Sequence, residues 1–187
     1  MAALRWPMRQ VLRALEAGGV VAYPTEAVYG LGCDPCSESA LAELLALKQR
    51  PAHKGLILIA HELDVLRPWL QPIPATLEPQ LMAGWPGPIT WLLPVADHVS
   101  PLLCGHHETL AVRVTAHPLA AALCRAFGGP IVSTSANPAT RPPARSALAV
   151  RRYFGDRLDA ILPGPLGTRR RPTEIRHGVT GAIVRRG

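Results

Sequence analysis

Three stretches of this sequence carry side chains that could bind a phosphate-bearing or other anionic ligand. In the first, Lys48, Arg50 and Lys54 fall within seven positions, and the two lysines are the only ones in the chain. Lysine ammonium groups and an arginine fork can together hold a triphosphate. Cations that follow a helix also stabilise its C-terminus through the helix dipole. The cluster is therefore compatible with a helix cap or with a phosphate site.

The second and third stretches are Arg113, inside the apolar run Leu-Ala-Val-Arg-Val, and the polar run Ser-Thr-Ser-Ala-Asn at 133–137. An arginine within a buried strand is costly unless a partner neutralises it. Arg113 thus pairs with an internal carboxylate or meets a ligand anion in a cleft, and the sequence favours neither. Hydroxyl and amide side chains after a strand commonly form a loop or a cap. The carboxyl end of a strand is also where α/β folds place ligands.

Residues 22–36, AYPTEAVYGLGCDPC, allow three interpretations: a phosphate loop, a metal or redox pair, or a turn between packed elements. Gly30 and Gly32 begin a dinucleotide-binding fingerprint, but Pro35 stands where its third glycine would be. No G-x-x-x-x-G-K-S/T loop occurs either. A nucleotide, if bound, is therefore held by neither standard glycine loop.

Cys33 and Cys36 have the spacing of a redox pair or of half a zinc site. Zinc needs two more ligands, and the candidates in Cys-Gly-His-His at 104–107 lack a standard spacing. The sequence therefore favours incidental cysteines near a turn, and no metal ligand is predicted. In the same turn, Glu26 orients a cation or caps the turn, and both interpretations stay open.

The composition predicts a single globular domain over residues 1–187. Apolar residues make up 48% of the chain and charged residues 18%, a balance typical of folded proteins. The longest apolar runs have four to six residues, whereas a membrane-spanning helix needs ~20. The N-terminal stretch carries arginines and no cleavage pattern, so we expect no signal peptide and a cytoplasmic location.

The net charge of +7 is concentrated in the last quarter of the chain. Residues 141–187 hold eleven arginines and three acidic residues, whereas residues 1–140 hold nine basic and ten acidic ones. Clustered arginine favours a phosphate-bearing partner. One hypothesis is therefore a protein that binds double-stranded RNA or tRNA through this quarter. Aromatic residues make up only 5%, which argues against a base-stacking surface.

Short apolar strands alternate with helices along the chain, which predicts an α/β sheet covered by helices. Ser37 or Ser39 can cap the second helix, and that helix must end before Pro51. Helices are expected at 8–15, 37–50, 117–129 and 146–155, and strands at 20–23, 55–60, 89–93, 110–114 and 130–133, with shorter ones at 159–162, 173–176 and 182–185.

Several motifs make the sequence resemble the YrdC family, in particular its bacterial threonylcarbamoyl-adenylate synthases. Their order, nearly end to end, argues against chance similarity. The motifs are Tyr-Pro-Thr-Glu at 23–26, Tyr-Gly-Leu-Gly-Cys-Asp at 29–34, Lys-Gln-Arg-Pro at 48–51, Lys-Gly-Leu-Ile-Leu-Ile at 54–59, Trp-Pro-Gly-Pro-Ile-Thr at 85–90, Leu-Ala-Val-Arg-Val at 110–114, Ser-Thr-Ser-Ala-Asn at 133–137 and Thr-Glu-Ile-Arg at 173–176.

The resemblance implies a single-domain, twisted mixed α/β sheet flanked by helices, with a basic concave face. The implied reaction converts L-threonine, bicarbonate and ATP to threonylcarbamoyl-AMP and pyrophosphate, for tRNA threonylcarbamoyl transferase proteins that act downstream. Because a threonine carbamate attacks the α-phosphate, the protein needs positioned cations and donors rather than a nucleophile. Mg²⁺ is expected with the triphosphate, although no carboxylate is an obvious ligand.

The resemblance also assigns roles to individual residues. Lys48 and Arg50 would be catalytic, and Arg113 would clamp the carboxylate of threonine. Pro143 departs from the family pattern, because many relatives have a nucleotide-contacting Ser or Thr there. Threonine would be bound by Thr25, Thr109, Arg113, Ser133 and Thr173, and ATP by Arg50, Lys54, Ser135, Asn137 and Arg185.

A third hypothesis is a family member that has lost or changed the synthase activity. The matching Lys48, Arg50 and residues 133–137 argue against it.

Overall fold

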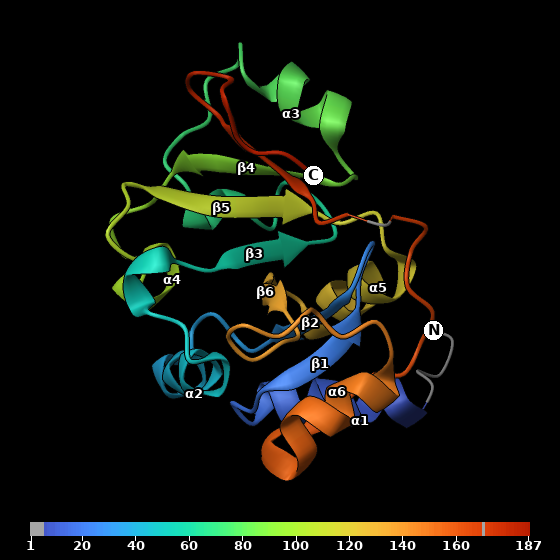
Figure 1. The fold of residues 1–187 in the computed structure, drawn as a ribbon. Coiled ribbons are helices and arrows are strands. Elements are labelled where there is room, and N and C mark those ends of the chain that lie inside the picture. Colours follow the sequence, from blue (N-terminus) through green and yellow to red (C-terminus); the bar gives the residue numbers. More distant parts are fainter. Residues whose placement is uncertain (1–5, 170) are drawn as a thin grey trace.

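The computed structural model describes residues 6–169 and 171–187. They form one mixed sheet flanked by helices (Figure 1), which confirms the predicted fold class. The strand order is β7-β1-β2-β6-β3-β5-β4-β8-β9. The pairs β1/β7, β3/β5 and β4/β8 are parallel and the other neighbours antiparallel. The strands are β1 (Val21–Pro24), β2 (Tyr29–Gly32), β3 (Ile57–Ala60), β4 (Ile89–Pro94), β5 (Thr109–Val114), β6 (Ile131–Ser135), β7 (Ala160–Ile161), β8 (Glu174–His177) and β9 (Ile183–Arg185).

Two hydrophobic clusters sandwich the sheet. Helices α1 and α5 pack with Tyr23 and Ile59 in one cluster, whereas α2 and α6 pack with Ala22 and Leu58 in the other. Adjacent residues of β1 and β3 thus face opposite cores, which explains their unbroken apolar sequences. The helices are α1 (Trp6–Glu16), α2 (Glu38–Lys48), α3 (Glu78–Gly84), α4 (Pro101–Cys104), α5 (Pro118–Phe127) and α6 (Ala147–Phe154), with short 3-10 helices η1 (Ala52–Lys54), η2 (Arg67–Trp69) and η3 (Gly155–Arg157).

Capping residues fix the helix ends where the sequence predicts them. The Ser37 hydroxyl accepts the Ala40 N–H at 3.3 Å, so Ser37 caps α2. Gln49, in the left-handed region at φ 51°, ends α2 before Pro51. No helix in the described ranges is long and apolar enough to cross a membrane.

β2 is the main element that the sequence pattern does not predict, together with α3 and α4. Two glycines among four residues obscure the strand, but packing requires the second of them, Gly32. A Cβ atom on Gly32 would lie 2.2 Å from the Val132 carbonyl oxygen and 2.8 Å from the Tyr23 ring. Because β2 pairs antiparallel with β1, residues 25–28 form the turn of a hairpin that holds Thr25 and Glu26 beside the sheet.

Replacing Gly32 by alanine should lower the free energy of unfolding by about 3 kcal/mol, because the added methyl group overpacks against sheet backbone. Gly129→Ala is the matched control. Its methyl group would lie 3.8 Å from the Phe127 ring, so we expect a change within about 1 kcal/mol. Equilibrium urea unfolding measures both. Wild-type stability of Gly32→Ala would contradict this account of β2.

Candidate functional site

A cavity of about 180 Å³ is lined by the β1–β2 hairpin, by residues of β6 and β3, and by Arg113 of β5. In the sheet, β6 lies between β2 and β3, and β5 lies on the other side of β3. Residues that are distant in sequence therefore become neighbours. The C-terminal strands close the other side of the cavity. Of the predicted site residues, those lining it are Thr25, Arg50, Arg113, Ser133, Ser135, Thr173 and Arg185, and Pro143 also lines it.

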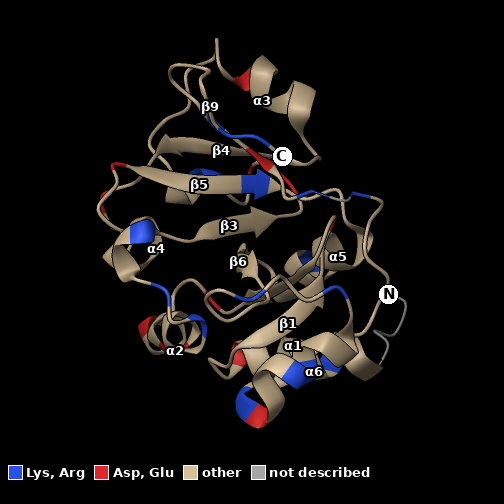
Figure 2. Ribbon diagram, viewed as in Figure 1, with Lys and Arg blue, Asp and Glu red and all other residues tan. Residues whose placement is uncertain are grey.

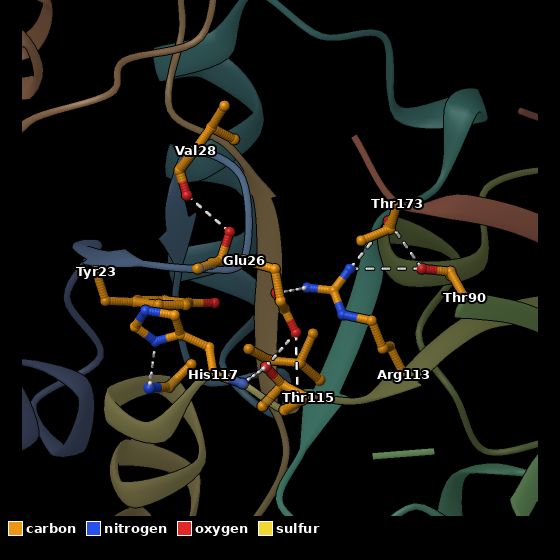
Figure 3. Close-up of polar contacts among 12 residues, drawn as sticks. Tyr23, Glu26, Val28, Thr90, Arg113, Thr115, His117 and Thr173 are labelled. Atoms are coloured by element: carbon orange, nitrogen blue, oxygen red, sulfur yellow. Dashed lines mark hydrogen bonds and ion pairs between the residues drawn. The ribbon is translucent and has the colours of Figure 1, made fainter. Parts of the chain in front are cut away.

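Arg113 is held in place from two sides (Figure 3). Its Nη2 lies 3.4 Å from Glu26 Oε2. Its Nη1 donates to the hydroxyls of Thr173 at 3.1 Å and Thr90 at 3.5 Å. Arg113 is only 4% exposed yet lines the cavity. Both alternatives for this arginine therefore meet in one residue, since it has an internal carboxylate partner and also faces a cavity.

Glu26, left open by the sequence, is the carboxylate partner. Its Oε1 accepts from the Thr115 hydroxyl at 2.7 Å and from the Ala116 N–H at 3.3 Å. Burial opposes ionisation, but the charge of Arg113 and the hydrogen bond from Thr115 outweigh it and hold the pKa of Glu26 below its ordinary value. Glu26 is thus a buried carboxylate whose ionised form is favoured and which pairs with the Arg113 guanidinium.

A second cavity, of about 220 Å³, lies on the other side of Arg50 and Arg185, which line both cavities. Lys54 and Thr109 line this second cavity, with His107 and apolar residues of β3, β4 and β9. The structure therefore separates Thr109, predicted with the threonine-binding residues, from the other four in that set.

Three arginines, from β5, β9 and the loop after α2, line the first cavity. Figure 2 marks the Lys and Arg positions of the ribbon in blue, including those on β5 and β9. Partial burial and the charges of Arg113 and Arg50 lower the pKa of Arg185. The Arg50 guanidinium is anchored on the Gly55 carbonyl oxygen, 2.9 Å from Nη2 and 3.1 Å from Nε. Like charges held this close without a carboxylate for each are typical of a site for an anionic ligand.

Lys48, predicted to be catalytic, contacts the backbone of the polar run at 133–137 and does not face the cavities. Its ammonium group donates to the backbone carbonyl oxygens of Ser135 and, at 3.0 Å, Asn137. The Asn137 side chain accepts from the Ser135 hydroxyl at 2.6 Å. Among the described residues, Lys48 and Asn137 line neither cavity. Both contact the loop that carries Ser135.

The structure bears on the cysteine hypothesis as well. Burial, then the carboxylates of Asp34 and Glu43, raise the pKa of the Cys33 thiol to about 12. This disfavours the thiolate that disulfide exchange requires. Within residues 6–169 and 171–187, no group of three or more His, Cys, Asp or Glu residues is placed to hold a metal.

Thr90 and Thr115 are the contacts of Arg113 and Glu26 that the sequence does not reveal. Thr90 lies within the motif at 85–90, and Thr115 directly follows β5. The position of Thr115 at a strand end was the available signal. Nothing local indicated that it contacts Glu26, 89 positions away.

Fold and site together define an α/β protein with two adjoining cavities. The buried Arg113 and several hydroxyls line the first, and Arg50 and Arg185 line both. The model of the Sua5/YciO/YrdC family, described as telomere recombination, matches residues 13–187. The chain belongs to this family.

Relatives with assigned names match over nearly their full length. Threonylcarbamoyl-AMP synthase of Halorhodospira halophila is 58% identical over 96% of this chain and 94% of its own. Threonylcarbamoyl-AMP synthase of Nitrosococcus oceani is 54% identical over 99% and 100%.

Solved structures have the same fold. The crystal structure of P. abyssi Sua5 complexed with L-threonine has a TM-score of 0.91 and is 29% identical, over 99% of this chain. The match covers 55% of the Sua5 chain, so this chain spans about half the length of that protein.

Proposed function

We propose that the protein is an L-threonylcarbamoyladenylate synthase, which converts L-threonine, bicarbonate and ATP to threonylcarbamoyl-AMP and pyrophosphate. The observation that carries the proposal is a buried arginine that lines a cavity together with several hydroxyl side chains, next to a second cavity that shares Arg50 and Arg185. An amino acid and a triphosphate bound side by side need this combination of groups. The relatives named above carry the same activity in their names.

We assign threonine to the first cavity, with its carboxylate on Arg113 and its polar groups facing Thr25, Ser133 and Thr173. A guanidinium fork matches a carboxylate in shape and charge. Because Glu26 already balances the charge of Arg113, the ligand anion also relies on the positive field of Arg50 and Arg185.

We assign ATP to Arg50, Lys54 and Arg185, with its α-phosphate near Ser135. The threonine amine first bonds to the carbon of bicarbonate with release of one water, and this gives the carbamate N-carboxythreonine. The carbamate oxygen then attacks the α-phosphorus, and the bond from that phosphorus to the bridging oxygen of pyrophosphate breaks. The protein supplies no nucleophile; its cations hold the reactants in line and stabilise the charge that develops on the leaving pyrophosphate. Thr109 lines only the second cavity, so this proposal places it on the ATP side and gives it no contact with threonine.

Lys48 and Asn137 act in this proposal through the loop. By holding the carbonyl oxygens of Ser135 and Asn137, the Lys48 ammonium fixes the backbone that presents the Ser135 hydroxyl. Arg50 then remains as the catalytic cation that lines both cavities.

The residues present do not form a dedicated site for Mg²⁺. In the described part of the chain, neither cavity is lined by an Asp or Glu side chain. Mg²⁺ is expected to enter on the phosphate oxygens of ATP, as part of the substrate. Bicarbonate as carbon donor, a cytoplasmic location and transfer of the product to tRNA-modifying transferase proteins complete the proposal.

Pyrophosphate release by the purified protein should require L-threonine and bicarbonate together with ATP. A coupled pyrophosphate assay that omits one substrate at a time measures this dependence. Release that continues unchanged without threonine would refute the proposed function.

The RNA-binding hypothesis gains no support from the relatives, whose names describe the synthase. Several C-terminal arginines are also engaged within the fold. Arg145 and Arg185 donate to the backbone carbonyl oxygens of Ala27 and Thr173, Arg157 to that of Tyr153, and Arg176 to the Glu174 carboxylate.

A further inference from the structure

The Thr115 hydroxyl has a fixed direction. Its oxygen accepts the His117 N–H at 3.1 Å, and the same oxygen lies 2.7 Å from Glu26 Oε1. A hydroxyl has one hydrogen to donate, and the carboxylate can only accept. The His117 N–H is itself a donor and uses a lone pair of the Thr115 oxygen, so the acceptor left for the hydroxyl hydrogen among the described groups is the Glu26 carboxylate. The hydroxyl hydrogen of Thr115 therefore points at Glu26. The turn after β5 therefore sets the position of the carboxylate.

Glu26 in turn restrains the Arg113 guanidinium. Glu26 Oε2 contacts Nη2 of Arg113, and the two threonine hydroxyls contact Nη1. Arg113 Nε and Glu26 Oε2 are buried and lack a hydrogen-bond partner among the described groups. The guanidinium thus keeps unused donor capacity while two of its nitrogens are anchored.

The three residues are almost inaccessible to water. Thr115 is 2%, Arg113 4% and Glu26 7% exposed. In such a site water cannot substitute for a lost partner, so a displaced charged group keeps its full desolvation cost. The orientation of Arg113 is therefore sensitive to the charge and position of Glu26.

We propose that Glu26 is a positioning residue, itself aligned by Thr115, that aims the Arg113 guanidinium at the carboxylate of the substrate amino acid. Thr115, Glu26 and Arg113 form one chain from the turn after β5 to the ligand. The cavity thereby selects substrates that have a free carboxylate. This inference rests on the proposed function, because it takes threonine as the ligand of Arg113.

Glu26→Gln tests the chain. The amide keeps the shape and the hydrogen bond from Thr115 but loses the charge that holds Arg113. We expect the KM for L-threonine to rise about 10- to 100-fold, the range for a charge-assisted hydrogen bond. The KM for ATP should stay within about twofold, since Arg50 and Arg185 are unaltered. Glu43→Gln, at an exposed position of α2, makes the same change in net charge and should leave both constants unchanged.

Recognition of the carboxylate gives a readout that general structural damage would not move. L-threonine amide lacks that anion. In competition assays the wild-type protein should prefer L-threonine to L-threonine amide strongly, and Glu26→Gln should lose about tenfold of this preference. Unchanged preference, an unchanged threonine KM, or equal losses for threonine and ATP would each overturn the proposal.

Thr115→Val provides a second variant if Glu26→Gln folds poorly. It retains every charge and should raise the threonine KM by about threefold to tenfold. In a double-mutant cycle the two substitutions should be clearly non-additive, because each interrupts the same chain. Additive effects would overturn the role of Thr115.

Calorimetric titration with threonine separates this inference from the proposed function. Wild-type protein that binds threonine more tightly than Glu26→Gln, yet releases no pyrophosphate, would refute the synthase and keep the positioning role. Wild-type turnover together with an unaffected Glu26→Gln variant would support the synthase and refute the positioning role of Glu26.

Discussion

Arg113→Ala should weaken L-threonine binding about 100-fold or more and ATP binding by about threefold or less. A buried guanidinium that meets a carboxylate through two charge-assisted hydrogen bonds supplies free energy of this size. Isothermal titration with each substrate measures both affinities. Arg113→Lys keeps the charge without the planar fork, so we expect an intermediate loss of about tenfold. Equal losses for threonine and ATP would assign Arg113 a purely structural role.

The same substitution has a consequence for stability that depends on pH. Alanine leaves Glu26 buried without its cation, which should cost about 3–5 kcal/mol at neutral pH. In the wild-type protein the pKa of Glu26 is lowered, so its favourable contribution is complete above the ordinary pKa and fades only as pH falls through the lowered one. In the variant, burial raises the pKa instead. The stability deficit should therefore be smaller at pH 5 than at pH 8.

Urea unfolding of both proteins at the two pH values measures this difference. Adding Glu26→Gln to Arg113→Ala removes the stranded charge and should recover part of the lost stability. A deficit that is the same at both pH values would contradict the pairing of Glu26 with Arg113.

Lys48→Met should lower kcat/KM for ATP about 10- to 100-fold, although Lys48 lines neither cavity in the described structure. Methionine preserves the aliphatic stem but leaves the Ser135 and Asn137 carbonyl oxygens without the ammonium group that holds them. The loop that presents the Ser135 hydroxyl then loses its fixed position. Steady-state kinetics with ATP as the varied substrate measure the effect. Wild-type kinetics in a folded Lys48→Met protein would show that the loop holds its position unaided.

The pKa of Lys48 gives this prediction a second test. Burial, then the charge of Arg50, lower that pKa from 10.5 to about 8. Between these values the folded protein binds fewer protons at Lys48 than the unfolded chain does, so the contribution of Lys48 to the free energy of unfolding increases with pH. Activity should instead fall above about pH 8, as the loop loses its cationic donor. As the pH rises above about 8, the free energy of unfolding of the wild-type protein relative to Lys48→Met should increase while the activity of the wild-type protein decreases.

The sequence by itself determined most of the elements and the family. Apolar runs of β3, β5 and β6 predict strands, because residues buried on both faces must all be apolar. Ser37 and the glycines after Phe127 mark helix ends through local hydrogen bonds and backbone freedom. The ordered motifs then lead to the family, which the matching family model confirms over residues 13–187.

Only the tertiary structure decided which groups face one another. Arg113 could pair inside the fold or bind a ligand, and its contact with Glu26 shows that it has a partner and still lines the cavity. Lys48 could face the phosphates, but its ammonium lies on the carbonyl oxygens of Ser135 and Asn137. The physical reason is separation along the chain. Periodicity and caps report contacts within a few residues, whereas Glu26 meets Thr115 across 89 positions, a contact that only the order and register of the strands create.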